Sequence, residues 1–481
     1  MDRYSQRRSE FFDAIGDGLA VIPAGRETVR NNDVHHTFRQ DSDFHFLTGF
    51  SEPESVAVFD PAHDDGYVLF VRPRDREMEA WNGRRAGVEG AIERYGADAA
   101  YPLSDLERVL RERLRGKTTL YYSTGTHQLD DRIQHLLNGA RSYQSRAGVP
   151  APDRIFDTSA VLHEMRLRKS PDELAALRTA CMVSAEAHAE AMRFAQPGVT
   201  EREIQAVLEY VFRSMGAVHD GYPSIVASGP NAVILHYTEN ERTVEDGDLL
   251  LIDAGAEYDY MSADITRTFP VGGSFTAPQR AVYDMVLAAQ DAVIAQARPG
   301  TPFSNLHEIA VEVLAEGLVA IGLLPGPVED AIAFGWYREF YFHGTGHWLG
   351  YDVHDAGAYR LDRAGRPLEP GMAFTVEPGV YVAPDRRELE LWSVEYDPIE
   401  LTDLGYLRGA TGAKSETESR REGLEPLKHK VPAEFLGIGI RIEDDVAVTE
   451  SSIEILSRGV PVAPDEIEAL CAEDSRLPRL T

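Results

Sequence analysis

The stretch DGDLLLIDAG, residues 246–255, has the pattern of a buried β-strand that ends on a carboxylate. A glycine precedes the apolar run, Asp253 closes it, and another glycine follows two residues later. The stretch EPGMAFTVEPG, residues 369–379, repeats this construction and ends its apolar run on Glu377. The repetition predicts two halves of one pseudo-symmetric domain with a site between them. A chance resemblance of two glycine-bounded strands is the alternative.

The helices expected before these strands repeat as well. AQPGVTERE (195–203) and ARPGTPFSN (297–305) each combine a helix end, a Pro-Gly turn and a new helix. Ser170 begins a predicted long helix that ends near Phe194, because a first-turn proline and an N3 glutamate follow it. Thr200 starts the next helix with the same capping pattern. The second domain is therefore expected to be built from two similar halves.

The N-terminal part of the chain alternates short apolar runs with polar helical stretches. The predicted strands are GLAVIPAG (18–25), SVAVFDP (55–61), GYVLFVRP (66–73) and TTLYYS (118–123). We therefore expect an α/β accessory domain over residues 1–165, followed by a second domain over residues 166–481.

Two further acids are expected on interior strands of the second domain. Asp264 lies in MSADITRTF (261–269), and Glu443 lies in GIGIRIEDD (437–445). An unpaired buried carboxylate costs several kcal/mol or becomes protonated. The acids have ordinary alternatives: Asp253 could cap a turn, Asp264 could pair with Arg267, and Glu443 could pair with Arg441. Four such acids in one domain favour compensation by metal, and a pair of divalent cations would lie about 3.5–4 Å apart.

Three of the 15 histidines gather in HGTGHWLGYDVHD, residues 343–355. His347 is flanked by glycines that let the backbone approach a cluster closely, so it is the natural fifth metal ligand. His343 and His354 are then left for the substrate. Hydrogen-bonded structural histidines are the alternative. Mostly oxygen ligands with one imidazole favour Mn²⁺, although Co²⁺, Fe²⁺ or Zn²⁺ also fit.

Together these candidates resemble the dinuclear metallopeptidases of the "pita-bread" fold, which include methionine aminopeptidase, prolidase, aminopeptidase P and creatinase. Those families place Asp, Asp, His, Glu and Glu in this chain order. The matching motifs here are IDAG with Asp253, DITRTFP with Asp264, HGTGH with His347, TVEPG with Glu377 and GIRIEDD with Glu443. The resemblance implies a creatinase-like N-terminal α/β domain followed by a pseudo-symmetric α+β catalytic domain.

The resemblance is strongest to bacterial aminopeptidase P, the Xaa-Pro aminopeptidases. RQDSDFHFLTGFSEPES (39–55), VLHEMRLRKSPDEL (161–174) and HYTEN (236–240) carry it. It implies release of the N-terminal residue from peptides with proline second. A prolidase restricted to Xaa-Pro dipeptides, which shares all five ligands, is the alternative. A non-catalytic binding protein is a third possibility, but such relatives typically lose ligands.

The resemblance also implies the roles of individual residues. Asp253 would hold one metal, Asp264 and Glu443 would bridge both, and His347 and Glu377 would complete the second. A water or hydroxide bridging the metals would be the nucleophile, and Glu377 would also be the general base. The implied substrate-facing histidines are His236 and His354. The implied wall of the proline pocket is His343, Tyr381 and Arg441.

Composition limits the partners and the compartment. The formal net charge of −31 disfavours nucleic acid and anionic membranes. Two cysteines without a metal spacing, no signal-like start and no long apolar run favour a cytoplasmic protein. The resemblance implies a homodimer or homotetramer, with Trp81 directed towards a neighbouring subunit; a partly buried core tryptophan is the alternative.

A long polar stretch near residues 386–434 separates two metal-bearing segments. Bacterial aminopeptidase P usually crosses this gap in fewer residues. Its section GATGAKSETESRREG (409–423) is expected to be mobile because it contains few apolar residues. A lid, an oligomer contact and an inert or structural insertion are the alternatives, and the last is favoured.

Overall fold

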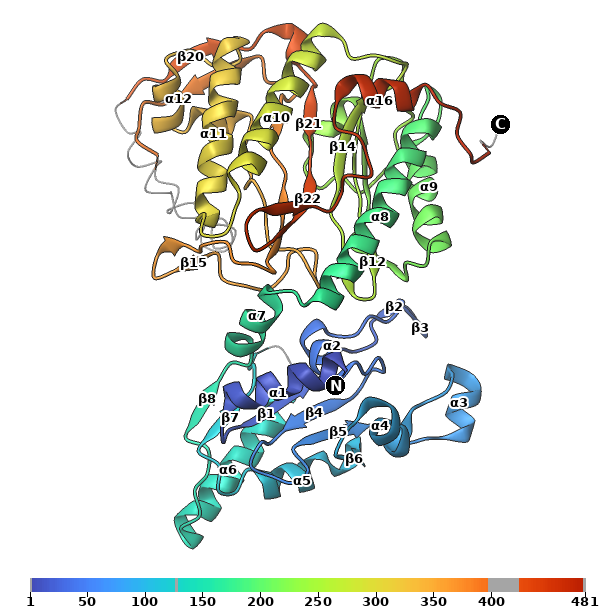
Figure 1. Ribbon diagram of the computed structural model, residues 1–481, viewed down its shortest axis with the longest axis vertical. Helices are drawn as coiled ribbons and strands as arrows, with labels where there is room; N and C mark the ends of the chain where they lie inside the picture. Colours follow the sequence, from blue (N-terminus) through green and yellow to red (C-terminus); the bar gives the residue numbers. More distant parts are fainter. Residues whose placement is uncertain (1, 126–128, 397–423, 479–481) are drawn as a thin grey trace. The chain divides into compact units, whose positions relative to one another are not determined.

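The computed structural model describes residues 2–125, 129–396 and 424–478. The chain forms two compact units, residues 1–166 and 167–481 (Figure 1). Among the described residues of the first unit, six strands form a mixed sheet in the order β6-β5-β4-β1-β7-β8. These strands are β1 (Leu19–Pro23), β4 (Val56–Phe59), β5 (Tyr67–Val71), β6 (Ala99–Pro102), β7 (Thr119–Tyr121) and β8 (Arg154–Phe156). The four strands predicted in this part of the sequence are confirmed as β1, β4, β5 and β7.

Helices complete the first unit. They are α1 (Arg3–Ile15), α2 (Ser42–Thr48), α3 (Arg76–Asn82), α4 (Gly87–Tyr95), α5 (Leu106–Arg113), α6 (Asp130–Ala147) and α7 (Ser159–Leu167). The core of the sheet packs against α5 and α6 through apolar side chains such as Val109 and Ile133. By contrast, α3 buries no residue, and the hairpin of β2 (Val29–Asn31) and β3 (Val34–His35) is exposed along its length.

Two helix pairs organise the second unit. In Figure 1, α8 (Pro171–Phe194) lies beside α9 (Glu201–Ser214), and α10 (Ala277–Gln296) lies beside α11 (Phe303–Ala320). The predicted helix starts are confirmed, because Ser170 and Thr200 each form a complete capping box with the glutamate three residues later. Shorter helices are α12 (Val328–Ala333) and α16 (Pro464–Cys471).

Each helix pair precedes a small antiparallel sheet, as the repeated sequence pattern predicts. The first sheet pairs β10 (Ile225–Ser228), β11 (Leu249–Asp253) and β14 (Thr266–Pro270), and the second pairs β17 (Ala373–Val376), β22 (Asp444–Val448) and β23 (Ile453–Ile455). Shorter strands are β9 (His219–Asp220), β12 (Ala256–Tyr258), β13 (Met261–Ser262), β15 (Arg360–Leu361), β16 (Ala364–Gly365), β18 (Gly379–Tyr381) and β21 (Gly439–Arg441).

The expected strand positions of two acids are wrong. Asp264 lies in the link between β13 and β14, and Glu443 lies between β21 and β22. The backbone of Glu443 instead forms an isolated bridge with Thr266 of the other half of the unit. The sequence pattern missed both breaks because Ala263 and Ile265 around Asp264, and Ile442 before Glu443, are apolar residues that give no turn signal.

The polar stretch near residues 386–434, which follows β18, contains one β-strand near its start and another near its end. Strand β19 (Glu388–Leu391) pairs with β20 (Leu427–Lys430) in register, so that Leu391 opposes Leu427. Leu389 and Leu391 are buried in the core of the unit. The section 409–423 expected to be mobile lies outside the described residues.

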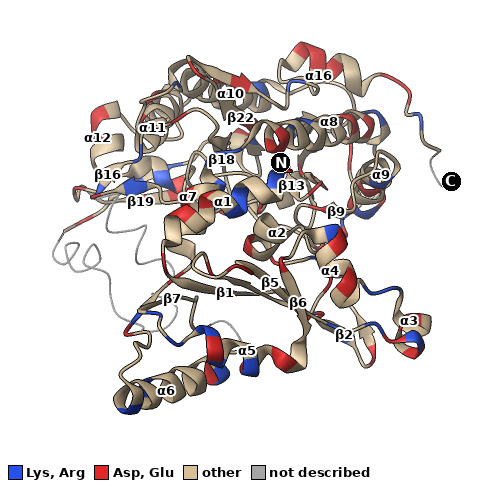
Figure 2. Cartoon of the chain, turned by 60° about the horizontal axis from the view of Figure 1, so that its bottom comes forward, with Lys and Arg blue, Asp and Glu red and all other residues tan. Residues whose placement is uncertain are grey.

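Charge and hydropathy complete the description. Acidic and basic residues are interspersed along the elements of both units (Figure 2). Among the described residues, the helices are all too short or too polar to cross a membrane.

Candidate metal centre

One cavity of the second unit, of about 270 Å³, collects most of the residues singled out by the sequence. It is lined by Asp253, Asp264, His347, Glu377 and Glu443, and also by His236, His343, His354 and Arg441. Tyr381 lies beside it, with its hydroxyl 2.9 Å from His343 Nε2 and 3.0 Å from Arg441 Nη1. Residues from both halves of the unit therefore meet at one place.

The end of β11 places the first acid. Asp253 pairs in register with Ile225 of β10 and Thr266 of β14, which fixes its backbone on both sides. The chain then turns at Gly255, where a Cβ atom would lie 1.7 Å from the carbonyl oxygen of Ala263. Only glycine permits this close approach, which brings the segment carrying Asp264 back beside Asp253.

The loop of His347 lies directly against β17. The backbone carbonyl of His347 accepts a hydrogen bond from the N–H of Thr375 at 3.0 Å. The backbone carbonyl of Thr345 accepts one from the N–H of Glu377 at 2.8 Å. A Cβ atom on Gly346 would lie 1.9 Å from the carbonyl oxygen of Thr375. Gly346 is therefore required for the close approach of this loop to β17, whereas the expected approach of the loop to a metal cluster stays a prediction.

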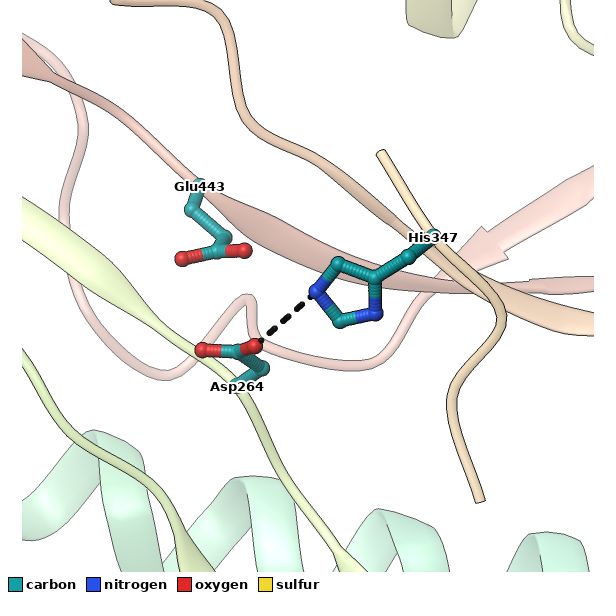
Figure 3. Close-up of side chains that lie close together, drawn as sticks. All are labelled: Asp264, His347 and Glu443. Atoms are coloured by element: carbon teal, nitrogen blue, oxygen red, sulfur yellow. Dashed lines mark ion pairs between the residues drawn. The ribbon is translucent and has the colours of Figure 1, made fainter. Parts of the chain in front are cut away.

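Three donors form the centre of the cavity (Figure 3). One ligand atom from each of Asp264, His347 and Glu443 lies within 4.8 Å of the others. Nε2 of His347 is 3.2 Å from Oδ2 of Asp264 and 3.6 Å from Oε1 of Glu377. Thr266 donates its hydroxyl to Glu443 at 2.6 Å, which orients that carboxylate. These groups come from different strands and loops and converge on a small volume.

The electrostatics of the cavity fit a cation. Burial, followed by the charge of Asp253, raises the pKa of Asp264. Burial and the charges of Asp264 and Glu377 raise the pKa of Glu443, and burial raises the pKa of Glu377 to about 7. Burial opposes a charge on His347, but the hydrogen bond to Asp264 and the nearby carboxylates raise the pKa of His347 to about 9. Buried carboxylates that destabilise one another in this way are a suitable donor set for divalent cations.

Arg441 offsets part of this negative charge, and Tyr222 hydrogen-bonds two of the carboxylates. Nη2 of Arg441 lies 2.5 Å from Oδ2 of Asp253. The hydroxyl of Tyr222 lies 2.5 Å from Oδ1 of Asp253 and 2.5 Å from Oδ1 of Asp264. Sequence reasoning missed Tyr222, because it lies 31 residues before Asp253 and no local pattern marks it. Among the residues that the structure describes, neither of the two ion pairs considered as alternatives is found: Arg267 pairs with Asp444, and Arg441 pairs with Asp253.

His343 and His354 are neutral rings at pH 7. Burial lowers the pKa of His343 to about 3 and that of His354 to about 4. Nδ1 of His343 donates to the carbonyl of Gly344 at 2.7 Å, so Nε2 accepts from Tyr381. The ring of His354 lies edge-on to that of His347, with 4.2 Å between centroids.

Comparison with known proteins identifies the family of this fold and cavity. The family model of metallopeptidase family M24 matches residues 175–450, and that of the aminopeptidase P N-terminal domain matches residues 4–121. The chain belongs to metallopeptidase family M24. The predicted family and the predicted fold class are thereby confirmed, as is the expectation of a hydrolase.

Relatives match this M24 chain along nearly its whole length. It is 40% identical over 471 residues to the Xaa-Pro aminopeptidase of Escherichia coli, covering 97% of each chain. The Pseudomonas aeruginosa aminopeptidase PepP has a similar structure, with a TM-score of 0.86 and 43% identity over 98% of this chain and 97% of that one. Zn-substituted E. coli aminopeptidase P in complex with product gives a TM-score of 0.85 and 40% identity over 98% and 97%. The roles of single residues in this M24 chain stay predictions.

Proposed function

We propose that this M24 peptidase is an Xaa-Pro aminopeptidase, which releases the N-terminal residue from peptides whose second residue is proline. One observation carries the proposal: the five predicted ligands and the predicted substrate-facing side chains line a single cavity. The full-length similarity to the E. coli Xaa-Pro aminopeptidase supports the same activity.

The proposed cofactor is a pair of divalent cations, most suitably Mn²⁺, with Co²⁺, Fe²⁺ or Zn²⁺ as other fits. The residues proposed to hold them are Asp253, Asp264, His347, Glu377 and Glu443. Bound there, such cations would supply an activated water as nucleophile and a positive field for the oxyanion of the tetrahedral intermediate.

The protein groups would handle protons and orientation. We assign Glu377 as general base, since its carboxylate faces the same cavity as the other ligands and lies 3.6 Å from His343 Nδ1. It would pass the proton on to the imino nitrogen of the leaving proline. His236 and His354 would hydrogen-bond the peptide and the intermediate. His343, Tyr381 and Arg441, which are joined by hydrogen bonds, would form the wall against the proline ring.

The first unit, residues 1–165 in the predicted division, is proposed as an accessory domain that forms a homodimer or homotetramer. Its exposed apolar side chains support this role: Trp81 on α3 is 80% exposed, and Val29 in the β2–β3 hairpin is 59% exposed. The exposure of Trp81 contradicts its alternative interpretation as a partly buried core residue. The two free cysteines support the proposed cytoplasmic location, and the net charge of −31 supports peptides rather than nucleic acid or membranes as partners.

The test compares a tripeptide Xaa-Pro-Yaa with the dipeptide Xaa-Pro, using full-length protein loaded with Mn²⁺. Release of Xaa and Pro-Yaa from the tripeptide is expected. Cleavage of the dipeptide alone would instead indicate a prolidase. Protein treated with a chelator is the control, and retention of full activity after complete metal removal would contradict the proposed mechanism.

A further inference from the structure

Helix α8 carries three polar side chains on one face that is turned into the core. Cys181, Ser184 and His188 are spaced three and four residues apart, so they lie on the same side of the helix. All three are 0% exposed. We call them the α8 polar stripe. Fully buried polar groups need partners, and here the partners are the segments that carry two of the proposed metal ligands.

Two members of the stripe hold the turn after Asp253. Nε2 of His188 lies 3.0 Å from the carbonyl oxygen of Ala254. Burial lowers the pKa of His188 to about 4, so its ring is neutral at pH 7 and donates the Nε2 hydrogen to that carbonyl. The hydroxyl of Ser184 accepts the backbone N–H of Ala256 at 2.9 Å.

The third member acts through Asp445. Sγ of Cys181 lies 3.1 Å from Oδ2 of Asp445, and the same oxygen accepts the backbone N–H of Asp264 at 2.9 Å. Asp445 is 0% exposed, and its own backbone N–H donates to Ser457 Oγ at 3.1 Å. Oδ2 of Asp445 therefore connects α8 to the backbone of Asp264, the metal-ligand candidate.

We propose that the α8 polar stripe and Asp445 are positioning residues that set the separation of the Asp253 and Asp264 carboxylates. Like-charged carboxylates repel one another, so a rigid backbone is needed to hold them ready for cations. Removing a residue that orients a metal ligand through hydrogen bonds typically lowers metal affinity or activity by about 10–100-fold. The inference rests on the proposed function only in taking both aspartates as metal ligands.

The experiment measures Mn²⁺ affinity by calorimetry on the metal-free, full-length protein. Asp445→Ala removes the acceptor of the Asp264 N–H, and His188→Leu removes the donor to Ala254. Each is expected to weaken Mn²⁺ binding by about 10–100-fold. Asp445→Asn and His188→Gln keep an acceptor and a donor, respectively, and are expected to recover most of the affinity. At saturating Mn²⁺ the weakened variants should lose kcat while KM for the peptide changes little.

The matched control is Val183→Ala, which opens the core at a residue of the same helix that is 0% exposed but apolar. It should lower the Tm and leave Mn²⁺ affinity unchanged. Equal weakening in Val183→Ala, or unchanged affinity in folded Asp445→Ala and His188→Leu, would overturn the proposal. Ser184→Ala deletes a single atom, so it covers the case in which the larger changes prevent folding, and unchanged affinity there would overturn the proposal too. A wild-type chain that binds Mn²⁺ tightly without cleaving peptides would contradict only the proposed function.

Discussion

Lys169 and Asp355 form an ion pair inside the second unit, with 2.8 Å between Nζ and Oδ2 and side chains only 1% and 0% exposed. Asp355 also donates its backbone N–H to the carbonyl of Trp348, which closes the loop that carries His354. Removing one partner leaves a buried charge uncompensated. Asp355→Ala is therefore expected to lower the free energy of unfolding by about 3–5 kcal/mol in denaturant titrations.

The exposed pair of Arg178 and Glu454 provides the comparison for that prediction. Its side chains are 46% and 39% exposed, so solvent screens the interaction. Glu454→Ala is expected to change the free energy of unfolding by about 0–1 kcal/mol. Equal losses of unfolding free energy in Asp355→Ala and Glu454→Ala would show that burial does not increase the contribution of the Lys169–Asp355 pair to stability.

Glu377→Gln keeps the size of the side chain but removes its ability to accept a proton. We expect kcat for Xaa-Pro-Yaa to fall by about 10²–10⁴-fold, with the Tm of the metal-free protein nearly unchanged. Glu388→Gln, on an exposed position of β19, is the control and should retain full activity. Activity of Glu377→Gln similar to wild type would remove its assignment as base.

His354→Ala removes a neutral ring that lies beside His347 in the cavity. If His354 hydrogen-bonds the intermediate, kcat should fall by about 10²-fold, as when an oxyanion donor is removed. The metal content per chain should stay close to that of the wild type. Loss of bound metal instead would mean that the roles of His347 and His354 are wrongly divided.

The pH dependence of stability should carry a signature of His188. Burial lowers the pKa of His188 from 6.5 to about 4, with Arg267 lowering it further and Asp253 raising it. The unfolded chain binds this proton below about pH 6.5, whereas the folded protein binds it only near pH 4. Stability therefore falls by about 3 kcal/mol from this group as pH drops through that window, and above it the group has no effect.

His188→Gln isolates this contribution from those of the other buried histidines. The metal-free variant should show a flatter decline of unfolding free energy between about pH 6.5 and pH 4 than the wild type. Identical slopes for the two proteins would contradict the depressed pKa of His188.

The sequence predicted much of the fold because its signals are local. A continuous apolar run located β11 with Asp253 at its end, and capping boxes located α8 and α9. The sequence pattern also predicted that the four acids and His347 lie at one metal centre. The role of each residue there was inferred from the resemblance to the metallopeptidase family. These features depend on residues close together in the chain.

What the sequence did not predict depends on contacts between distant segments. Tyr222 reaches Asp264 across 42 residues, and Asp445 accepts the N–H of Asp264 across 181 residues. The interruption of the strand at Glu443 likewise coincides with a contact between the halves, its backbone bridge with Thr266. No periodicity encodes such pairings, so they become visible only when both halves are folded.

The β19–β20 hairpin has an evolutionary consequence. Its paired ends, Leu391 and Leu427, are fixed by the ladder and by burial of β19, so the stretch between them begins and ends at adjacent points. The chain stays anchored beyond β19, because Trp392 accepts a hydrogen bond from Trp336 Nε1 at 2.9 Å and the backbone N–H of Tyr396 donates to the carbonyl of Ala333 at 2.9 Å. Tyr396 also packs against the core of the unit. Sequence variation in this part of the chain is therefore expected to spare Trp392, Tyr396 and the β19–β20 ladder.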